Sequence, residues 1–170
     1  MGIFDKLLGK KQEKDVPKAK IADNTYLAVA AGELLPIEAS EDPVFSQKMM
    51  GDGYVIFPTE NTIIAPVSGT VQTLFPTLHA IGIVSDAGDE IIIHVGLDTV
   101  KLNGEGFTAF VKQGDRVEAG QKLLEVDFDA IRDKVPSIGT PVVITNIGSR
   151  TVTLSETKTV KAGDIAMRVE

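Results

Sequence analysis

Two histidines are the side chains in this sequence best suited to chemistry near neutral pH, and the 170 residues contain no others. His94 follows three isoleucines in EIIIHVG, residues 90–96, and His79 lies in TLHAIG, residues 77–82. A neutral imidazole is a nucleophile, a general base or a metal ligand, because its unperturbed pKa is about 6.5. The absence of Cys excludes disulfides, thiolate metal sites and a cysteine nucleophile.

Strand alternation predicts that His94 points away from the core. Successive side chains of a strand point to opposite faces. One face of this segment is unbroken and apolar, and it consists of Ile91, Ile93, Val95 and Leu97. His94 then shares the other face with Ile92 and Gly96, and the missing side chain of Gly96 leaves room for a partner to approach the imidazole.

The same alternation predicts a common face for the segment around the second histidine. Its members are Thr77, His79, Ile81 and Ile83. If the two segments form neighbouring strands, both histidines share one shallow apolar depression. For each histidine alone, a hydrogen-bonded polar residue on a strand is the alternative interpretation, and the residues by themselves leave the two evenly balanced.

The surrounding sequence predicts an all-β fold that positions these strands. The 16 Gly and 8 Pro separate short stretches rich in Val, Ile and Thr, such as TIIAPV and PVVITNI, a pattern typical of a sandwich or barrel. Residues 42–49 and 127–135 indicate short helical turns. The first has Asp42 as N-cap and Pro43 at the first helical position.

Two echoes indicate an internal duplication. LAVAAGELLPI, residues 27–37, resembles IAPVSGTVQTL, residues 64–74, and VKQGDRVEAGQKLLEV, residues 111–126, resembles VKAGDIAMRV, residues 160–169. Together they predict a sheet that is built from two related halves.

Length and charge divide the chain into a tail, residues 1–20, and one domain, residues 21–170. The tail has six Lys and three acidic residues, which gives it a net charge of +3. Because the whole chain has a net charge of −7, residues 21–170 carry a net charge of −10. An acidic domain argues against nucleic acid as a partner. A flexible, solvated segment is the favoured interpretation of the tail, and an amphipathic helix that settles on an anionic membrane is the alternative.

Nothing in the sequence indicates a membrane span or a signal peptide. No apolar run approaches the ~20 residues that a bilayer requires, and the N-terminus lacks an apolar h-region and a cleavage site. We therefore expect a cytoplasmic protein, and contact of the tail with the inner face of the membrane is the alternative already noted.

A known motif surrounds the first histidine. GDEIIIHVGLDTV, residues 88–100, resembles at every position the signature of the glucose-family IIA components of the bacterial phosphoenolpyruvate-dependent sugar phosphotransferase system. Blocks at 42–59, 65–71, 102–107, 114–121 and 140–146 resemble the same family in the same order. The resemblance covers about residues 25–170. It implies an antiparallel β-sandwich of the barrel-sandwich hybrid kind, with a duplicated motif and one or two short helical turns.

The resemblance also implies roles for individual residues. His94 corresponds to the phosphorylated histidine, His79 to the histidine that stabilises the phosphoryl group, and Thr77 to the threonine that orients His79. The positions that correspond to partner contacts are Asp42, Val44, Phe45, Met49, Met50, Phe75, Ile92, Gly96 and Asp98. Without the resemblance, core packing would be the preferred interpretation of Phe75 and Met49. Ile92 departs from members that carry Phe there.

The implied function is that of a phosphocarrier in sugar uptake, which makes the chain a phosphotransferase component with a phosphohistidine intermediate. The donor would be phospho-HPr and the acceptor the IIB domain of a glucose-type permease, with regulatory proteins as further partners. No cofactor is expected. His79 and His94 supply only half of a tetrahedral zinc site, so zinc would require a carboxylate from another chain.

Two other functions compete with this one. A zinc hydrolase requires a third ligand and a base, and neither His-x-His nor His-Glu-x-x-His spacing is present. A regulatory binding module that never carries phosphate would keep the apolar patch and make His94 dispensable.

Overall fold

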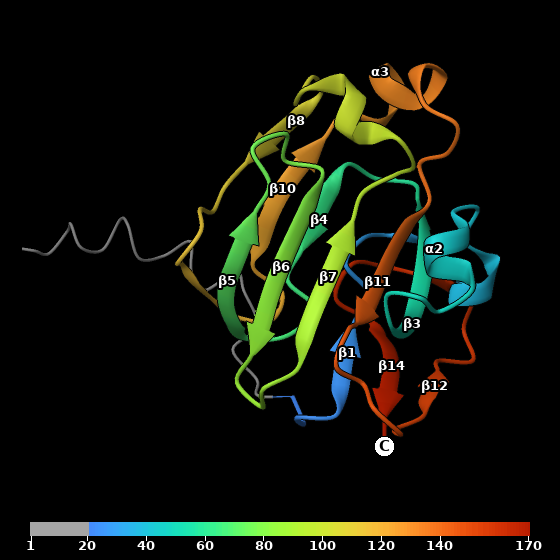
Figure 1. Cartoon of the computed structure of the whole chain (residues 1–170), viewed down its shortest axis with the longest axis vertical. Coiled ribbons are helices and arrows are strands. Elements are labelled where there is room, and N and C mark those ends of the chain that lie inside the picture. Colours follow the sequence, from blue (N-terminus) through green and yellow to red (C-terminus); the bar gives the residue numbers. More distant parts are fainter. Residues whose placement is uncertain (1–20) are drawn as a thin grey trace, which may run out of the picture.

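The computed structural model describes residues 21–170, and the interpretations of residues 1–20 lie outside this range. Antiparallel strands form three sheets (Figure 1), one of eight strands in the order β13-β2-β3-β11-β7-β6-β5-β9 and two of three strands, β1-β14-β12 and β4-β10-β8. The strands are β1 (Thr25–Leu27), β2 (Gly32–Pro36), β3 (Asp52–Pro58), β4 (Thr62–Ile64), β5 (Gly69–Leu74), β6 (Ala80–Ser85), β7 (Glu90–His94), β8 (Phe107–Ala109), β9 (Arg116–Val117), β10 (Lys122–Val126), β11 (Thr140–Ile144), β12 (Val152–Leu154), β13 (Thr159–Val160) and β14 (Ile165–Val169).

The main core explains why the strands alternate in polarity. It joins alternate residues of the large sheet, such as Ile81 and Ile93, to residues of the two small sheets, such as Leu124 and Met167. Each of these side chains is at most 1% exposed. Burial of one such side chain contributes about 1.5–3 kcal/mol. Ile91, Ile93 and Val95 of the expected apolar face are confirmed as part of the core, whereas Leu97, beyond the end of β7, is only partly buried and lies outside it.

A second apolar cluster covers the opposite face of the large sheet. Its buried members are Ile37, Phe45, Val55 and Val143, with Leu35, Met50, Phe57 and Ile92 partly buried against it. The short helix α2 (Pro43–Ser46) brings Phe45 to this face, beside β3 and β11 (Figure 1). His94 therefore leaves the main core and meets this second cluster.

Both predicted helical turns are present. Asp42 caps α2 by accepting a hydrogen bond from the amide of Val44 at 3.0 Å, and Pro43 occupies the first turn. Asp127 caps α3 (Phe128–Ile131) in the same way through the amide of Ala130 at 3.1 Å. Further 3-10 turns lie at Ile37–Ala39, Thr99–Leu102 and Arg132–Lys134. Within residues 21–170, no helix has the length and apolar character to cross a membrane.

The strand order shows the internal duplication that the echoes predict. A two-fold relation exchanges β7 with β11, β6 with β3, β5 with β2 and β9 with β13. Two short edge pairings match, β13 with the start of β2 and β9 with the start of β5. Backbone hydrogen bonds repeat as well: Ala28 exchanges bonds with the 163–164 turn, as Ala65 does with the 120–121 turn. The fold is thus a duplicated antiparallel β-sandwich, as expected.

Candidate active site at two histidines

The two histidines meet at one end of the central strand pair β6–β7. His94 is the last residue of β7, and His79 immediately precedes β6. The strands are antiparallel neighbours, and the amide of Val95 donates to the carbonyl of His79 at 2.7 Å. The ring centroids lie 5.1 Å apart with the planes at 81°. The expected proximity of the two histidines is therefore confirmed.

The local path to His79 differs from the predicted one. β6 begins at Ala80, so the alternation that places Ile81 in the core does not extend to Thr77 and His79. These two residues belong to a turn in which Leu78 adopts a left-handed conformation, with φ of 64°. The prediction of one common strand face was therefore wrong here. A leucine with positive φ is uncommon, and sequence patterns did not indicate it.

The turn holds His79 between polar and aromatic neighbours. Oγ1 of Thr77 lies 2.6 Å from Nδ1 of His79, and the ring of Phe75 packs edge-on at a centroid distance of 5.3 Å. His79 is only 4% exposed. Burial lowers the pKa of His79, and the nearby His94 lowers it further. His79 is therefore neutral near pH 7.

A backbone carbonyl fixes the tautomer of His94. Nδ1 of His94 lies 2.9 Å from the carbonyl oxygen of Gly96, and a carbonyl can only accept, so Nδ1 donates. In the neutral ring, Nε2 then carries the lone pair. No hydrogen bond within residues 21–170 engages this nitrogen. Burial lowers the pKa of His94, while the Gly96 carbonyl and the charge of Asp42 oppose that shift.

The positions that the resemblance assigned to partner contacts differ in the exposed fraction of their side chains: some lie at the surface and others are buried. Val44, Met49 and Phe75 are 40%, 69% and 44% exposed. Core packing as the interpretation of Met49 and Phe75 is therefore wrong, since their side chains lie at the surface. Phe45 is 4% exposed and packs on His94 at a centroid distance of 5.3 Å.

Of the remaining contact positions, Met50, Ile92 and Asp42 lie beside the second cluster or His94. Met50 and Ile92 are half-buried in the second cluster. Asp42 combines the α2 cap with an electrostatic effect on His94. Asp98 is half-exposed, adopts a left-handed conformation with φ of 64°, and pairs with Lys101 at 3.7 Å. The surroundings of the two imidazole rings are thus largely apolar, with the carboxylate of Asp42 at the N-terminal end of α2.

The described residues hold too few ligands for a closed metal site. His79 and His94 are two imidazoles, and no cluster of three or more His, Cys, Asp or Glu side chains occurs within residues 21–170. A tetrahedral zinc ion needs four ligands. The pair therefore fits a metal only if another chain completes the coordination.

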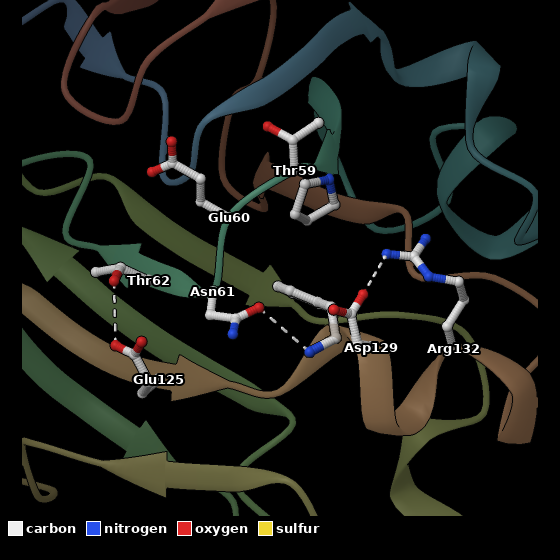
Figure 2. A pocket seen from close by; sticks show the side chains of 9 residues that line it. Thr59, Glu60, Asn61, Thr62, Glu125, Asp129 and Arg132 are labelled. Atoms are coloured by element: carbon white, nitrogen blue, oxygen red, sulfur yellow. Dashed lines mark hydrogen bonds and ion pairs between the residues drawn. The ribbon is translucent and has the colours of Figure 1, made fainter.

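A separate hollow lies at the β4–β10–α3 corner (Figure 2). Its lining includes Thr59, Glu60, Asn61, Thr62, Glu125, Asp129 and Arg132. Several of these groups are already paired: Asn61 accepts from the amide of Phe128 at 3.3 Å, and Thr62 donates to Glu125 at 3.1 Å. Neither histidine lines it, so this hollow is separate from the histidine pair.

The sequence did not indicate the backbone supports of His94. The carbonyls of Ser137 and Gly139 accept from the amides of Leu97 and Gly96, at 2.9 and 3.1 Å. Main-chain acceptors carry no side-chain signature, and the isolated bridge between Leu97 and Ser137 joins segments 40 residues apart in sequence.

The fold and the site define a class: antiparallel β-sandwiches that bring two histidines together beside an apolar cluster. A family model described as phosphoenolpyruvate-dependent sugar phosphotransferase system, EIIA 1, matches residues 24–150. A glucose-specific EIIA component from Halalkalibacterium halodurans is 42% identical over 166 residues, which is 97% of this chain and 96% of that protein. The chain belongs to this EIIA family of the sugar phosphotransferase system.

Two further relatives are a longer protein that contains a matching segment and a protein whose structure has been solved. A glucose-specific EIICBA component from Staphylococcus saprophyticus is 48% identical over 146 residues, 86% of this chain and 21% of that protein. The chain thus spans about a fifth of this relative. The solved glucose permease IIA from Mycoplasma capricolum matches with a TM-score of 0.80 and 45% identity, over 84% of this chain and 93% of that one. These relatives support a phosphocarrier role in sugar transport.

Proposed function

We propose that the chain accepts a phosphoryl group from phospho-HPr on Nε2 of His94 and passes it to the IIB domain of a sugar permease. The observation that carries the proposal is the pair of imidazole rings, whose centroids lie 5.1 Å apart, with Nδ1 of His94 engaged by the Gly96 carbonyl. Nε2 is then the nucleophile. Its lone pair forms the new N–P bond while the P–N bond of the donor's phosphohistidine breaks.

His79 would stabilise the transferred group. Oγ1 of Thr77 lies 2.6 Å from Nδ1 of His79, and in this proposal the hydroxyl donates to Nδ1. The proton of His79 would then lie on Nε2, from which it can be donated to a phosphoryl oxygen. Phosphoryl transfer passes through a loose, roughly in-line transition state, so positioning and charge stabilisation supply most of the catalysis. A neutral donor suits a carrier, because it stabilises the phosphoryl group without trapping it as a fixed cation would.

The exposed apolar side chains would form the docking surface. Val44, Met49 and Phe75 are exposed at the surface, Phe75 packs on His79, and methionine adapts to more than one partner. Water exclusion on docking would direct the phosphoryl group to the partner instead of to hydrolysis. The EIICBA relative carries further segments beyond the part that matches this chain, which supports a IIB domain as the acceptor.

Further partners belong to the same proposal. Regulatory proteins would use the same exposed surface, and one that supplies a carboxylate would form a zinc site with His79 and His94, in which water or the second carboxylate oxygen is the fourth ligand. The protein would act in the cytoplasm, where its donor and acceptor meet, and the basic residues 1–20 would add contact with anionic lipid.

Incubation with phosphoenolpyruvate, Enzyme I and HPr tests the transfer. We expect an acid-labile, base-stable phosphate on His94, none on a His94→Ala variant that keeps its circular dichroism spectrum, and slow transfer from His79→Gln to purified IIB. A chain that stays unphosphorylated but binds partners through the patch would instead be a regulatory module. Loss of folding in His94→Ala would mean that the ring is structural.

A further inference from the structure

The carbonyl that fixes the tautomer of His94 is held by a short network of peptide groups. The carbonyl of Gly96 and the amide of Leu97 belong to one trans peptide, so they point in opposite directions. The amide donates to the carbonyl of Ser137 at 2.9 Å, and the carbonyl accepts from Nδ1 of His94 at 2.9 Å. The direction of this peptide therefore determines which ring nitrogen carries the proton.

The preceding peptide is held at both ends as well. The amide of Gly96 donates to the carbonyl of Gly139 at 3.1 Å, and the carbonyl of Val95 accepts from Oγ1 of Thr99 at 2.5 Å. Thr99 is fully buried, so its hydroxyl has no water as an alternative partner. The Thr99 hydroxyl is therefore the side-chain anchor of a turn that is otherwise held by main-chain bonds.

The methyl group of Thr99 closes the same turn. A Cβ added at Gly96 would lie 2.5 Å from Cγ2 of Thr99, and Gly96 has φ of 76°. Thr99 thus packs directly on the glycine whose carbonyl faces His94. A buried unpaired carbonyl is unfavourable, so loss of the hydroxyl would favour rotation of the Val95–Gly96 peptide.

We propose that Thr99 is a positioning residue for phosphoryl transfer: by anchoring the Val95 carbonyl it directs the Gly96 carbonyl at Nδ1 of His94 and keeps Nε2 as the nucleophile. Thr99 does not touch the phosphoryl group. Its effect on transfer rests on the proposed function, whereas its effect on the tautomer does not.

The tautomer of His94 is measurable by long-range ¹H–¹⁵N correlation spectra of the unphosphorylated protein above pH 7.5. The wild type should show the Nδ1–H tautomer. Thr99→Val keeps the shape and removes the hydroxyl, and it should lower the ratio of Nδ1–H to Nε2–H about fivefold, the factor that loss of one ordinary hydrogen bond carries. Thr99→Ser should keep the wild-type ratio.

Matched variants separate this role from general destabilisation. Thr25→Val changes another buried threonine, on β1, and should leave the His94 spectrum unchanged. Thr99→Ala is measured beside Thr99→Val, because its small side chain cannot strain the turn. An unchanged tautomer in both deletion variants, a shifted tautomer in Thr99→Ser, or failure of both deletion variants to fold would overturn the proposal.

Phosphorylation gives the second readout. Acceptance of phosphate from HPr should slow in Thr99→Val by about the same factor and recover in Thr99→Ser. If the wild type accepts no phosphate, the proposed function fails while the tautomer result stands. A tautomer shift with an unchanged acceptance rate would overturn the link to transfer.

Discussion

Replacement of Gly96 by alanine tests the close approach at the centre of the site. Two costs are expected. Gly96 has φ of 76°, and a non-glycine residue in the left-handed region costs about 1–2 kcal/mol. The added methyl would also lie 2.5 Å from Cγ2 of Thr99 and 3.2 Å from the carbonyl oxygen of Ser137, and overpacking of this kind costs about 1–3 kcal/mol.

The two costs together predict that Gly96→Ala lowers the free energy of unfolding by about 2–5 kcal/mol. Gly148→Ala is the matched control, since Gly148 has φ of 65° with nothing within 4 Å of an added Cβ. The control should lose only the backbone contribution, about 1–2 kcal/mol. The difference between the variants therefore measures the contact with Thr99 and Ser137.

Urea unfolding followed by far-ultraviolet circular dichroism supplies both values, because the chain has no Trp as a fluorescent probe. Equal midpoints and slopes for the two variants would refute the close packing described here. The same samples report on function. Displacement of the Gly96 carbonyl should slow phosphate acceptance in Gly96→Ala and leave Gly148→Ala at the wild-type rate.

Further predictions concern charge and the docking surface. Burial lowers the pKa of both histidines, so NMR titration should give midpoints below about 6.5. Because the histidines have higher pKa values in the unfolded chain, that chain binds protons first as the pH falls. The free energy of unfolding should therefore be constant above about pH 6.5 and decrease below it, and the decrease should be less steep in His94→Gln. An equally steep decrease in the variant would contradict the lowered pKa of His94. The carboxylate of Asp89 accepts a hydrogen bond from Tyr26 and pairs with Arg150 at 2.9 Å, so Asp89→Asn should lower the free energy of unfolding by about 1–3 kcal/mol. An unchanged free energy of unfolding in this variant would show that these contacts do not stabilise the fold. Met49→Ser should leave the melting temperature unchanged and raise KM for HPr or IIB about fivefold to tenfold, since Met49 is 69% exposed; an unchanged KM would remove Met49 from the surface.

The sequence predicted those features that depend on local patterns. Strand alternation placed Ile91 and Ile93 in the core, and Asp42 followed by Pro43 marked the start of α2. The echoes around Gly32 and Gly69 predicted the duplication, because close strand pairing excludes a side chain at both. These features follow from residue type and spacing within a few positions.

Other features depend on contacts between distant segments. The left-handed Leu78 has no propensity signal, and it ended the alternation that was extended to His79. Burial of Phe45 beside exposed Met49 follows from how α2 lies on β3 and β11, which helical spacing alone does not determine. The supports of His94 are main-chain carbonyls at Ser137 and Gly139, and any residue type supplies those.

The two-fold relation within the large sheet stops short of the site. With Gly32 matched to Gly69, the counterparts of His79 and His94 in the other half are Asp52 and Val143. Asp52 pairs with Lys48 at 3.4 Å, and Val143 is fully buried in the second apolar cluster, so that half presents no second imidazole pair. On the proposed function, a loaded chain would therefore hold a single phosphoryl group, because a symmetric backbone carries different side chains at its two equivalent places.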